Sequence, residues 1–354
     1  MDGNFAIFRL PHDNSCTMVR QTQGLPTALS SCHELTDVEG FVFAPFAISA
    51  EHPVYVLKPD VIETAQLSDA EDIIGCDIKC ESVSSERSVY ADDFAAFHEK
   101  LLSGDFKKIV LARRNDVSCA DDIQPMALFR KACRMYPRMF VSLISTSLTG
   151  TWLMATPEIL LEGVGRRWHT MALAGTMKVK EDKVLSDCAA GNVDEINKEW
   201  SKKNIEEQHV VARYISGCLE RYADEIDEKG PYTVRAGNVV HLRSDFNLML
   251  HDGKDIGRLI EDLHPTPAVC GFPKAETFDF IVENEHCRRS FYSGFAGPMF
   301  KNATSHLFVS LRCMHIDGHK YSLYAGGGLL SDSVEQQEWE ETEAKLDTMK
   351  ALFR

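Results

Sequence analysis

The residues best suited to chemistry lie near the end of the sequence, where four small residues precede a predicted helix. Residues 325–328, Ala-Gly-Gly-Gly, leave the backbone nearly bare, so a ligand can approach main-chain N–H groups closely. Residues 333–336 have the spacing of a capping box, and the helix that follows carries Glu338, Glu341 and Lys345 on one face. Two carboxylates and an ammonium beside a glycine-rich turn predict a site for a divalent cation and an anionic ligand. The alternative for this segment alone is an exposed, charged helix face.

The composition is that of a soluble globular protein. Of 354 residues, 44% are hydrophobic and 26% are charged, which allows a sizeable core and does not indicate disorder. The formal net charge is −15, and no cluster of Lys and Arg could follow a phosphate backbone, so no nucleic acid partner is expected. The same charge repels a small anion at long range. Such a substrate has to be held by local Arg, Lys or backbone N–H groups, or by a metal ion.

The spacing of the cysteines and the hydropathy of the chain indicate the cellular compartment of the protein. The eleven cysteines lack the paired spacings of a zinc site or a short disulfide framework, and Cys76 and Cys80 are the one close pair. The first residues are polar, and no apolar run is long enough to cross a bilayer. These features predict a cytoplasmic protein with reduced thiols and no membrane association.

Periodicity predicts a mixed α+β (α/β) architecture. Phe94, Phe97 and Leu101 share one face of a helix at 89–103, and β-branched residues at 106–113 predict a strand after it. Residues 1–90 are less specific and contain short β-like runs. No repeat or linker divides the chain, so we expect a single domain of residues 1–354. The remaining expected strands are 4–10, 40–48, 54–57, 139–146, 151–164, 167–175, 306–316 and 320–326, and the remaining expected helices are 123–136, 187–224, 255–263, 274–286 and 334–352.

Common nucleotide-binding, hydrolase and zinc-protease motifs are absent, which leaves acid–base chemistry on carboxylates, lysines and a metal ion. Seven segments in one order resemble the chorismate-utilising enzymes: isochorismate synthase, salicylate synthase, anthranilate synthase component I and aminodeoxychorismate synthase component I. The resemblance covers about residues 90–354 and implies one domain of two packed, mostly antiparallel β-sheets with helices outside. The segments are 107–113, 155–160, 172–176, 203–209, 264–273, 292–297 and the terminal glycine and glutamate residues.

Three positions that differ among members of this family indicate the reaction. Lys108 matches a lysine that activates water in isochorismate and salicylate synthases, where anthranilate synthases have glutamine. Ala174 stands where aminodeoxychorismate synthases carry a lysine that forms a covalent adduct. Ala268 matches the small residue of isochorismate synthases, where salicylate synthases typically have threonine. The resemblance therefore implies an isochorismate synthase, with a salicylate synthase or a non-catalytic chorismate-binding relative as the alternatives.

The implied reaction moves a hydroxyl group from C4 to C2 of chorismate and needs one base and one acid. A lysine must be neutral to deprotonate water, and Lys108 has apolar neighbours in sequence that favour the neutral form. A carboxyl must be protonated to act as an acid, and Glu158 lies between Pro157 and Ile159 in an apolar run. The alternatives are an exposed strand lysine beside Lys107 and an edge-strand carboxylate.

A Mg²⁺ cofactor is implied by the same resemblance. Glu207 and Glu341 would be its direct ligands and Glu338 a ligand or water-bridged neighbour, with the metal holding the ring carboxylate of the substrate. Asn204 replaces an acid that some relatives carry. Arg243 also departs from the family pattern.

The remaining expected site residues bind the substrate. By resemblance, Arg312 and Tyr292 hold the enolpyruvyl carboxylate, because a guanidinium group suits a carboxylate. Gly326 and Lys345 would hold the other carboxylate, while Gly175, Thr176, His241 and Ala268 would form the wall around the ring. No glutaminase subunit is expected because the reaction needs no ammonia, and the short N-terminal region suggests a monomer. The resemblance does not separate menaquinone from siderophore biosynthesis.

Overall fold

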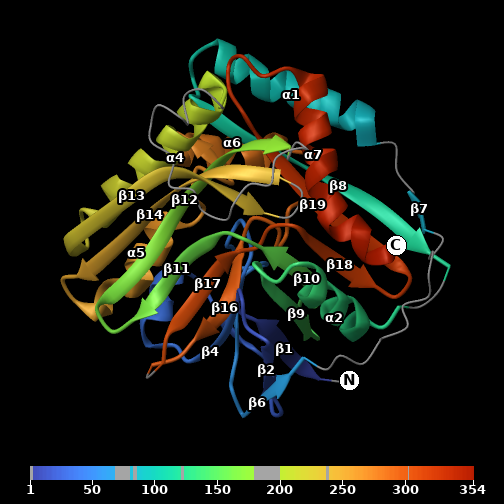
Figure 1. Ribbon diagram of the computed structural model, residues 1–354, viewed down its shortest axis with the longest axis vertical. Helices are drawn as coiled ribbons and strands as arrows, with labels where there is room; N and C mark the ends of the chain where they lie inside the picture. Colours follow the sequence, from blue (N-terminus) through green and yellow to red (C-terminus); the bar gives the residue numbers. More distant parts are fainter. Residues whose placement is uncertain are drawn as a thin grey trace.

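Two antiparallel β-sheets pack face to face and carry helices on their outer surfaces (Figure 1). The computed structural model describes residues 3–67, 80–82, 86–120, 123–178, 200–236, 239–301 and 303–354. The expected mixed α+β class and paired sheets are confirmed. Within the described residues, no helix is long and apolar enough to cross a membrane.

The first sheet is built around the long strand β8. In spatial order its strands are β15 (Gly271–Phe272), β8 (Lys108–Cys119), β19 (Lys320–Leu329), β18 (Cys313–Asp317), β10 (Gly150–Thr156), β9 (Phe140–Thr146), β1 (Asn4–Arg9), β2 (Ser15–Gln21) and β6 (Val61–Gln66), with β7 (Cys80–Ser82) beside β8.

The second sheet ends in a long two-stranded hairpin. Its order is β13 (Ala223–Ala236), β14 (Val239–Leu250), β12 (Arg167–Lys178), β11 (Ile159–Val164), β17 (Ser305–Val309), β16 (Phe295–Met299), β4 (Gly40–Ala44), β5 (Val54–Leu57) and β3 (Thr27–Leu29).

The helices cover the outer faces through their apolar sides (Figure 1). Buried side chains of α2 and α7 join the core of the first sheet, and those of α4 and α5 join the core of the second. Between the sheets, the rings of Phe140 and Phe308 stack with centroids 4.2 Å apart. The helices are α1 (Glu86–Leu102), α2 (Pro125–Met135), α4 (Lys202–Leu219), α5 (Ile256–Leu263), α6 (Lys274–Asn284) and α7 (Glu335–Lys350).

A two-stranded ribbon crosses from one sheet to the other. Strands β10 and β18 pair in the first sheet, whereas their continuations β11 and β17 pair in the second. The ribbon stays hydrogen-bonded at the crossing, where the Ala155 N–H donates to Arg312 O at 3.1 Å and the Val309 N–H donates to Glu158 O at 2.9 Å. Each of the expected strands 151–164 and 306–316 is therefore two strands. The break in each holds an expected site residue, Glu158 or Arg312.

Several sequence expectations were wrong. Strands β13 and β14 were not predicted, and α4 ends at Leu219 rather than 224; the first part of the expected helix 187–224 lies in residues 179–199, outside the described residues. Strand β13 is an exposed edge strand with a weak apolar alternation, so its sequence lacks a clear strand pattern. Helix α7 begins after Val334 without a side-chain cap, because Ser333 Oγ instead accepts a hydrogen bond from Leu330 N–H at 3.0 Å.

The thiol expectation also needs a correction. Cys119 is disulfide-bonded, and its backbone partner across β7 and β8 is Cys80. The expectation that all cysteines are reduced is wrong for Cys119. The described cysteines outside a disulfide are Cys16, Cys32, Cys133, Cys218, Cys270, Cys287 and Cys313.

Candidate active site

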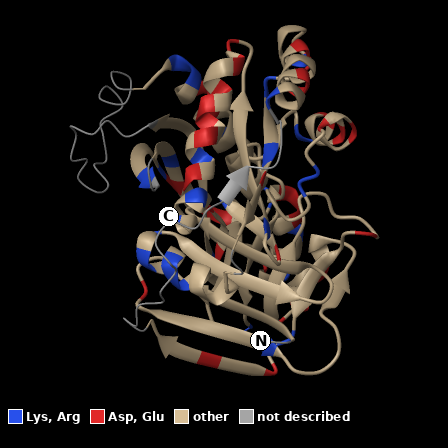
Figure 2. Cartoon of the chain, turned by 90° about the vertical axis from the view of Figure 1, so that its right-hand side faces the viewer, with Lys and Arg blue, Asp and Glu red and all other residues tan. Residues whose placement is uncertain are grey.

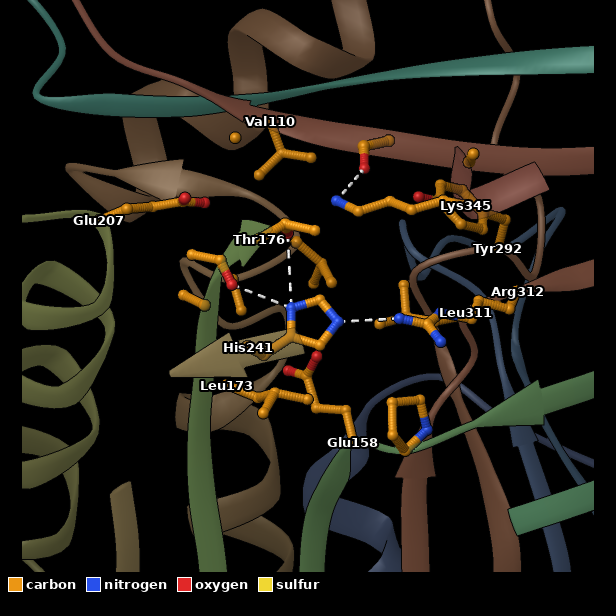
Figure 3. Close-up of a pocket in the computed structure, with 18 of the residues that line it drawn as sticks. Val110, Glu158, Leu173, Thr176, Glu207, His241, Tyr292, Leu311, Arg312 and Lys345 are labelled. Atoms are coloured by element: carbon orange, nitrogen blue, oxygen red, sulfur yellow. Dashed lines mark hydrogen bonds between the residues drawn. The ribbon is translucent and has the colours of Figure 1, made fainter. Parts of the chain in front are cut away.

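A pocket opens beside the ribbon crossing (Figure 3). It encloses about 610 Å³, including open solvent at its mouth. Three expected residues lie behind its wall, where Lys108 contacts Glu207 and Glu341 contacts Lys345, while Glu338 contacts Lys203. The expected residues that line the pocket itself are Glu158, Gly175, Thr176, Glu207, His241, Ala268, Tyr292, Arg312, Gly326 and Lys345.

Glu158 sits at the crossing with its carboxyl group facing the pocket (Figure 3). The residue is 3% exposed. Burial raises the pKa of the Glu158 carboxyl to about 8, although the charges of Lys108, Lys345 and Arg312 oppose this shift. Glu158 therefore holds a proton near neutral pH and can donate it inside the pocket, as the acid assignment requires.

Lys108 points into the protein, and its neighbour Lys107 points out. Lys108 is fully buried in β8, whereas Lys107 is exposed and lies over the ring of Phe272, as expected for adjacent residues of a strand. Lys108 Nζ lies 3.0 Å from Glu207 Oε1, in an ion pair rather than a well-aligned hydrogen bond. The burial of Lys108 agrees with its expected apolar surroundings, and the exposed-lysine alternative does not apply to it.

The glycine-rich segment is not a turn. Gly326, Gly327 and Gly328 lie inside β19, paired with β8. A Cβ atom on Gly328 would lie 2.1 Å from Glu207 Oε1, and one on Gly326 would lie 2.8 Å from the Tyr292 hydroxyl. The bare strand lets these side chains pack directly on the backbone, which a larger residue would prevent.

His241 and Arg312 form one unit. His241 Nδ1 lies 3.0 Å from Gly175 O, which can only accept, so Nδ1 carries the proton; Nε2 then accepts a hydrogen bond from Arg312 Nη2 at 2.8 Å (Figure 3). Burial, followed by the charges of Arg312 and Lys345, holds the pKa of His241 well below its ordinary value. A neutral imidazole therefore orients the guanidinium. Arg312 has a φ of 46°, an uncommon conformation for a residue other than glycine.

Lys345 reaches the pocket from α7, opposite Glu207 (Figure 3). Its ammonium donates to Gly326 O at 2.9 Å and to Glu341 Oε1 at 2.7 Å. Arg312 lines the same pocket from the crossing ribbon. Two fixed cations on one pocket suit a small dianion.

The carboxylates expected to bind metal each contact a lysine. The pairs are Lys108–Glu207, Lys203–Glu338 and Lys345–Glu341. Attraction by Lys108, Lys203 and Lys345 outweighs burial and lowers the pKa of Glu207, whereas burial raises the pKa of Glu338 against the attraction of Lys203. Acidic residues recur along α7, the helix that runs down to the C-terminus (Figure 2).

The donor set fits a Mg²⁺ ion in kind. Glu338 is 1% exposed, and its Oε2 has no hydrogen-bond partner among the described residues. A Cβ atom on Gly327 would lie 3.5 Å from that oxygen and 3.9 Å from Glu341 Oε1, whereas Glu207 meets the next residue, Gly328, on the other face of the strand. Oxygen donors from two helices are the ligands that Mg²⁺ prefers. Across the described ranges, however, no three acidic, imidazole or thiol groups are already close enough to hold a metal ion.

Sequence reasoning missed Lys203 as a site residue. It opens the segment 203–209 that contributed to the family resemblance, but only the folded chain places it against Glu338. The two departures from the family pattern lie at different places. Asn204 Nδ2 donates to Thr176 O at 3.3 Å beside the pocket wall, whereas Arg243 pairs with Asp245 and does not line the pocket.

Known proteins resemble this chain in sequence and in fold. The "Vibriobactin-specific isochorismate synthase" of Vibrio cholerae is 26% identical over 257 residues, covering 72% of this chain and 63% of that protein. "Isochorismate synthase EntC" of Escherichia coli is 28% identical over 247 residues, covering 70% and 62%. The chain thus spans about three fifths of the length of these curated relatives.

The structure of MenF, the menaquinone-specific isochorismate synthase from Escherichia coli, has the same fold. It superposes with a TM-score of 0.80 at 21% identity, covering 99% of this chain and 89% of that chain. The sequence profile of the family described as "Chorismate binding enzyme" matches residues 61–354, which include the crossing ribbon, β8, β19 and α7. The chain therefore belongs to the family of chorismate binding enzymes.

Proposed function

We propose that this protein is an isochorismate synthase. It adds water at C2 of chorismate and releases the C4 hydroxyl as water, so the ring double bonds shift and no redox partner or second substrate is needed. The observation that carries this proposal is that protonated Glu158 faces the pocket at the crossing of the two sheets, while buried Lys108 lies behind the pocket wall against Glu207. The names of the similar proteins support the same activity.

Glu158 and Lys108 have complementary tasks. Glu158 donates its proton to the leaving C4 hydroxyl, a role that its raised pKa supports. Lys108 takes a proton from the incoming water. Only a neutral lysine can accept this proton. The ion pair between Lys108 and Glu207 therefore has to break before Lys108 deprotonates the water.

The two carboxylates of chorismate would be held at separate places. Arg312, oriented by His241, faces the pocket beside Tyr292 and suits the enolpyruvyl carboxylate. The ring carboxylate would lie toward Lys345 and Gly326. These local cations offset the repulsion that the net charge of −15 exerts on a dianion.

We include Mg²⁺ in the proposal, with Glu207, Glu338 and Glu341 as its protein ligands. When bound, the ion would supply positive charge beside the ring carboxylate. The unpartnered Oε2 of Glu338 supports this assignment.

The small residues of the pocket favour isochorismate as the product. Ala174 and Ala268 both line it, and neither can form a covalent adduct or offer a hydroxyl group. Water as nucleophile needs no ammonia, so we propose no glutaminase subunit. Because pocket residues come from positions 110 to 345, we propose that the chain acts as one catalytic domain.

The direct test incubates the purified protein with chorismate and Mg²⁺ and separates the products by chromatography. We expect isochorismate at equilibrium with chorismate and little salicylate or pyruvate. Rapid stoichiometric release of pyruvate would instead identify a salicylate synthase. No turnover by the wild type, with chorismate binding intact, would indicate a non-catalytic relative.

A further inference from the structure

Lys203 holds a carboxylate that the proposed metal needs. Its Nζ forms an ion pair with Glu338 Oε1 between the first turn of α4 and the first turn of α7. The Lys203 side chain is 21% exposed and that of Glu338 is 1% exposed, so the carboxylate is buried and only the lysine reaches the solvent. The other carboxylate oxygen of Glu338 has no partner among the described residues.

The ammonium of Lys203 faces more than Glu338. The carboxylates of Glu207 and Glu341 also lie close enough to act electrostatically on it. These are the three groups proposed as metal ligands, and they come from both helices that flank the bare strand. A single positive charge therefore lies among the carboxylates that a divalent cation would have to bring together.

We propose that Lys203 is the built-in counter-cation of the metal-free site and that it must leave Glu338 before a divalent cation can bind. This inference rests on the Mg²⁺ dependence proposed above. A buried carboxylate without a cation is strongly unfavourable, so some positive charge has to accompany Glu338 in every state of the protein. Lys203 supplies that charge without metal through Oε1, and it competes with the metal for the negative charge of the Glu338 carboxylate.

The other two lysine pairs are differently placed. Lys345 also donates to Gly326 O and faces the pocket, and Lys108 is fully buried beneath Glu207. Lys203 does not line the pocket, and within the part of the chain that the structure describes its ammonium donates a hydrogen bond only to Glu338. Its partly exposed side chain can swing into solvent, which makes it the lysine best placed to exchange with a metal ion.

The test measures binding of Mn²⁺, as a spectroscopic substitute for Mg²⁺, without substrate. Free Mn²⁺ is followed by electron paramagnetic resonance at pH 8.5, so that a proton on Glu338 does not replace Lys203 as its partner. We compare wild type with Lys203→Met, Lys203→Arg, which keeps the charge, and Lys202→Met, which removes an exposed neighbouring lysine. We expect Lys203→Met to bind Mn²⁺ at least tenfold more tightly than wild type, and both controls to stay within threefold.

Equal or weaker binding by Lys203→Met overturns the inference but leaves the proposed metal dependence intact. Absence of Mn²⁺ binding by both wild type and Lys203→Met overturns both. Failure of turnover with normal Mn²⁺ binding by the wild type would instead concern the proposed reaction alone.

Thermal unfolding gives a second readout that does not depend on activity. Without metal, Lys203→Met is expected to unfold at a lower temperature than wild type because Glu338 has lost its cation, and saturating Mg²⁺ is expected to raise its midpoint by more than it raises that of wild type. Lys203→Gln serves in both experiments if the Met variant does not fold. Equal Mg²⁺-induced shifts in wild type and both variants contradict the proposal.

Discussion

Replacing Glu158 by Gln should make the protein more stable and much less active. Burial raises the pKa of Glu158 from 4.5 to about 8, so ionising this group in the folded protein costs ~5 kcal/mol more than in the unfolded chain. The stability of the wild type is then unaffected below about pH 4.5, where the group is protonated in both states. It falls as pH rises through 4.5 toward 8, because only the unfolded chain releases the proton. The amide of Gln carries no charge and avoids this loss.

The size of the effect follows from the same numbers. At pH 5 we expect Glu158→Gln to differ from wild type by about 1 kcal/mol or less, at pH 7 to be more stable by about 3 kcal/mol, and at pH 9 by about 5 kcal/mol. These values are upper limits, because the amide leaves part of its own hydrogen-bonding capacity unused in the buried pocket. Urea unfolding of metal-free protein at the three pH values measures them.

Activity should change in the opposite direction. Losing the acid lowers kcat by about 10² to 10⁴-fold. In wild type, the basic limb of the kcat/KM profile should fall near pH 8, and it should be absent in Glu158→Gln. An amide variant that is less stable than wild type at pH 9, or that keeps the basic limb, would refute the assignment of a buried, protonated acid.

Glu162 provides a matched control on the next strand. Although burial favours its protonated form, hydrogen bonds and charges from His169 and His306 lower the pKa of Glu162 to about 2. Its carboxylate therefore contributes stability that is present above about pH 4.5 and is lost as the pH falls toward 2. Glu162→Gln should be less stable than wild type at pH 7 and keep its kcat, because Glu162 does not line the pocket.

Four further predictions test the rest of the site. Lys108→Ala should lower kcat by about 10² to 10⁴-fold, while Lys107→Ala should leave it unchanged. The reverse result in steady-state kinetics would show that Lys107, not Lys108, faces the active site. Exhaustive chelation by EDTA should abolish turnover and Mg²⁺ should restore it, so full activity after chelation would rule out the metal. Ala268→Thr should raise pyruvate release, measured by a coupled assay, and no rise would remove the argument for that position. His241→Ala should raise KM about tenfold and change kcat less, because Arg312 loses the acceptor that orients it; an unchanged KM would show that this hydrogen bond does not serve binding.

The crossing ribbon explains why one pocket can hold an acid and a cation so close together. At the crossing, Glu158 and Arg312 leave the regular pairing of either sheet, and main-chain hydrogen bonds on both sides fix their positions. The positive φ of Arg312 is an unfavourable backbone conformation, and the hydrogen-bonded strands on either side hold it in place. The site is therefore built where the two sheets exchange strands, rather than on a flexible loop.

The sequence by itself determined the features that depend on local order. The family resemblance selected Lys108 as the inward lysine, and because adjacent residues of a strand point to opposite faces, Lys107 then has to point outward, as the structure confirms. Helical spacing put Glu338, Glu341 and Lys345 on one side of α7, and the apolar neighbours of Glu158 predicted its raised pKa. The seven ordered segments predicted the family, because each can be recognised from its residue types and their spacing alone, without knowing which residues are in contact.

Only the tertiary structure decided which groups meet. Lys203 and Glu338 are 135 residues apart, and Arg312 and His241 are 71 residues apart, so no local pattern could pair them. Pro157 interrupts the run 151–164, which could have signalled a break, but the sequence does not show that the two halves join different sheets, since both are extended. The glycines looked like a turn because glycine commonly marks turns, whereas here they form a strand on which Glu207 and Tyr292 pack. The carboxylates and lysines form one site because contacts between residues far apart in the sequence bring them together, which residue type alone does not show.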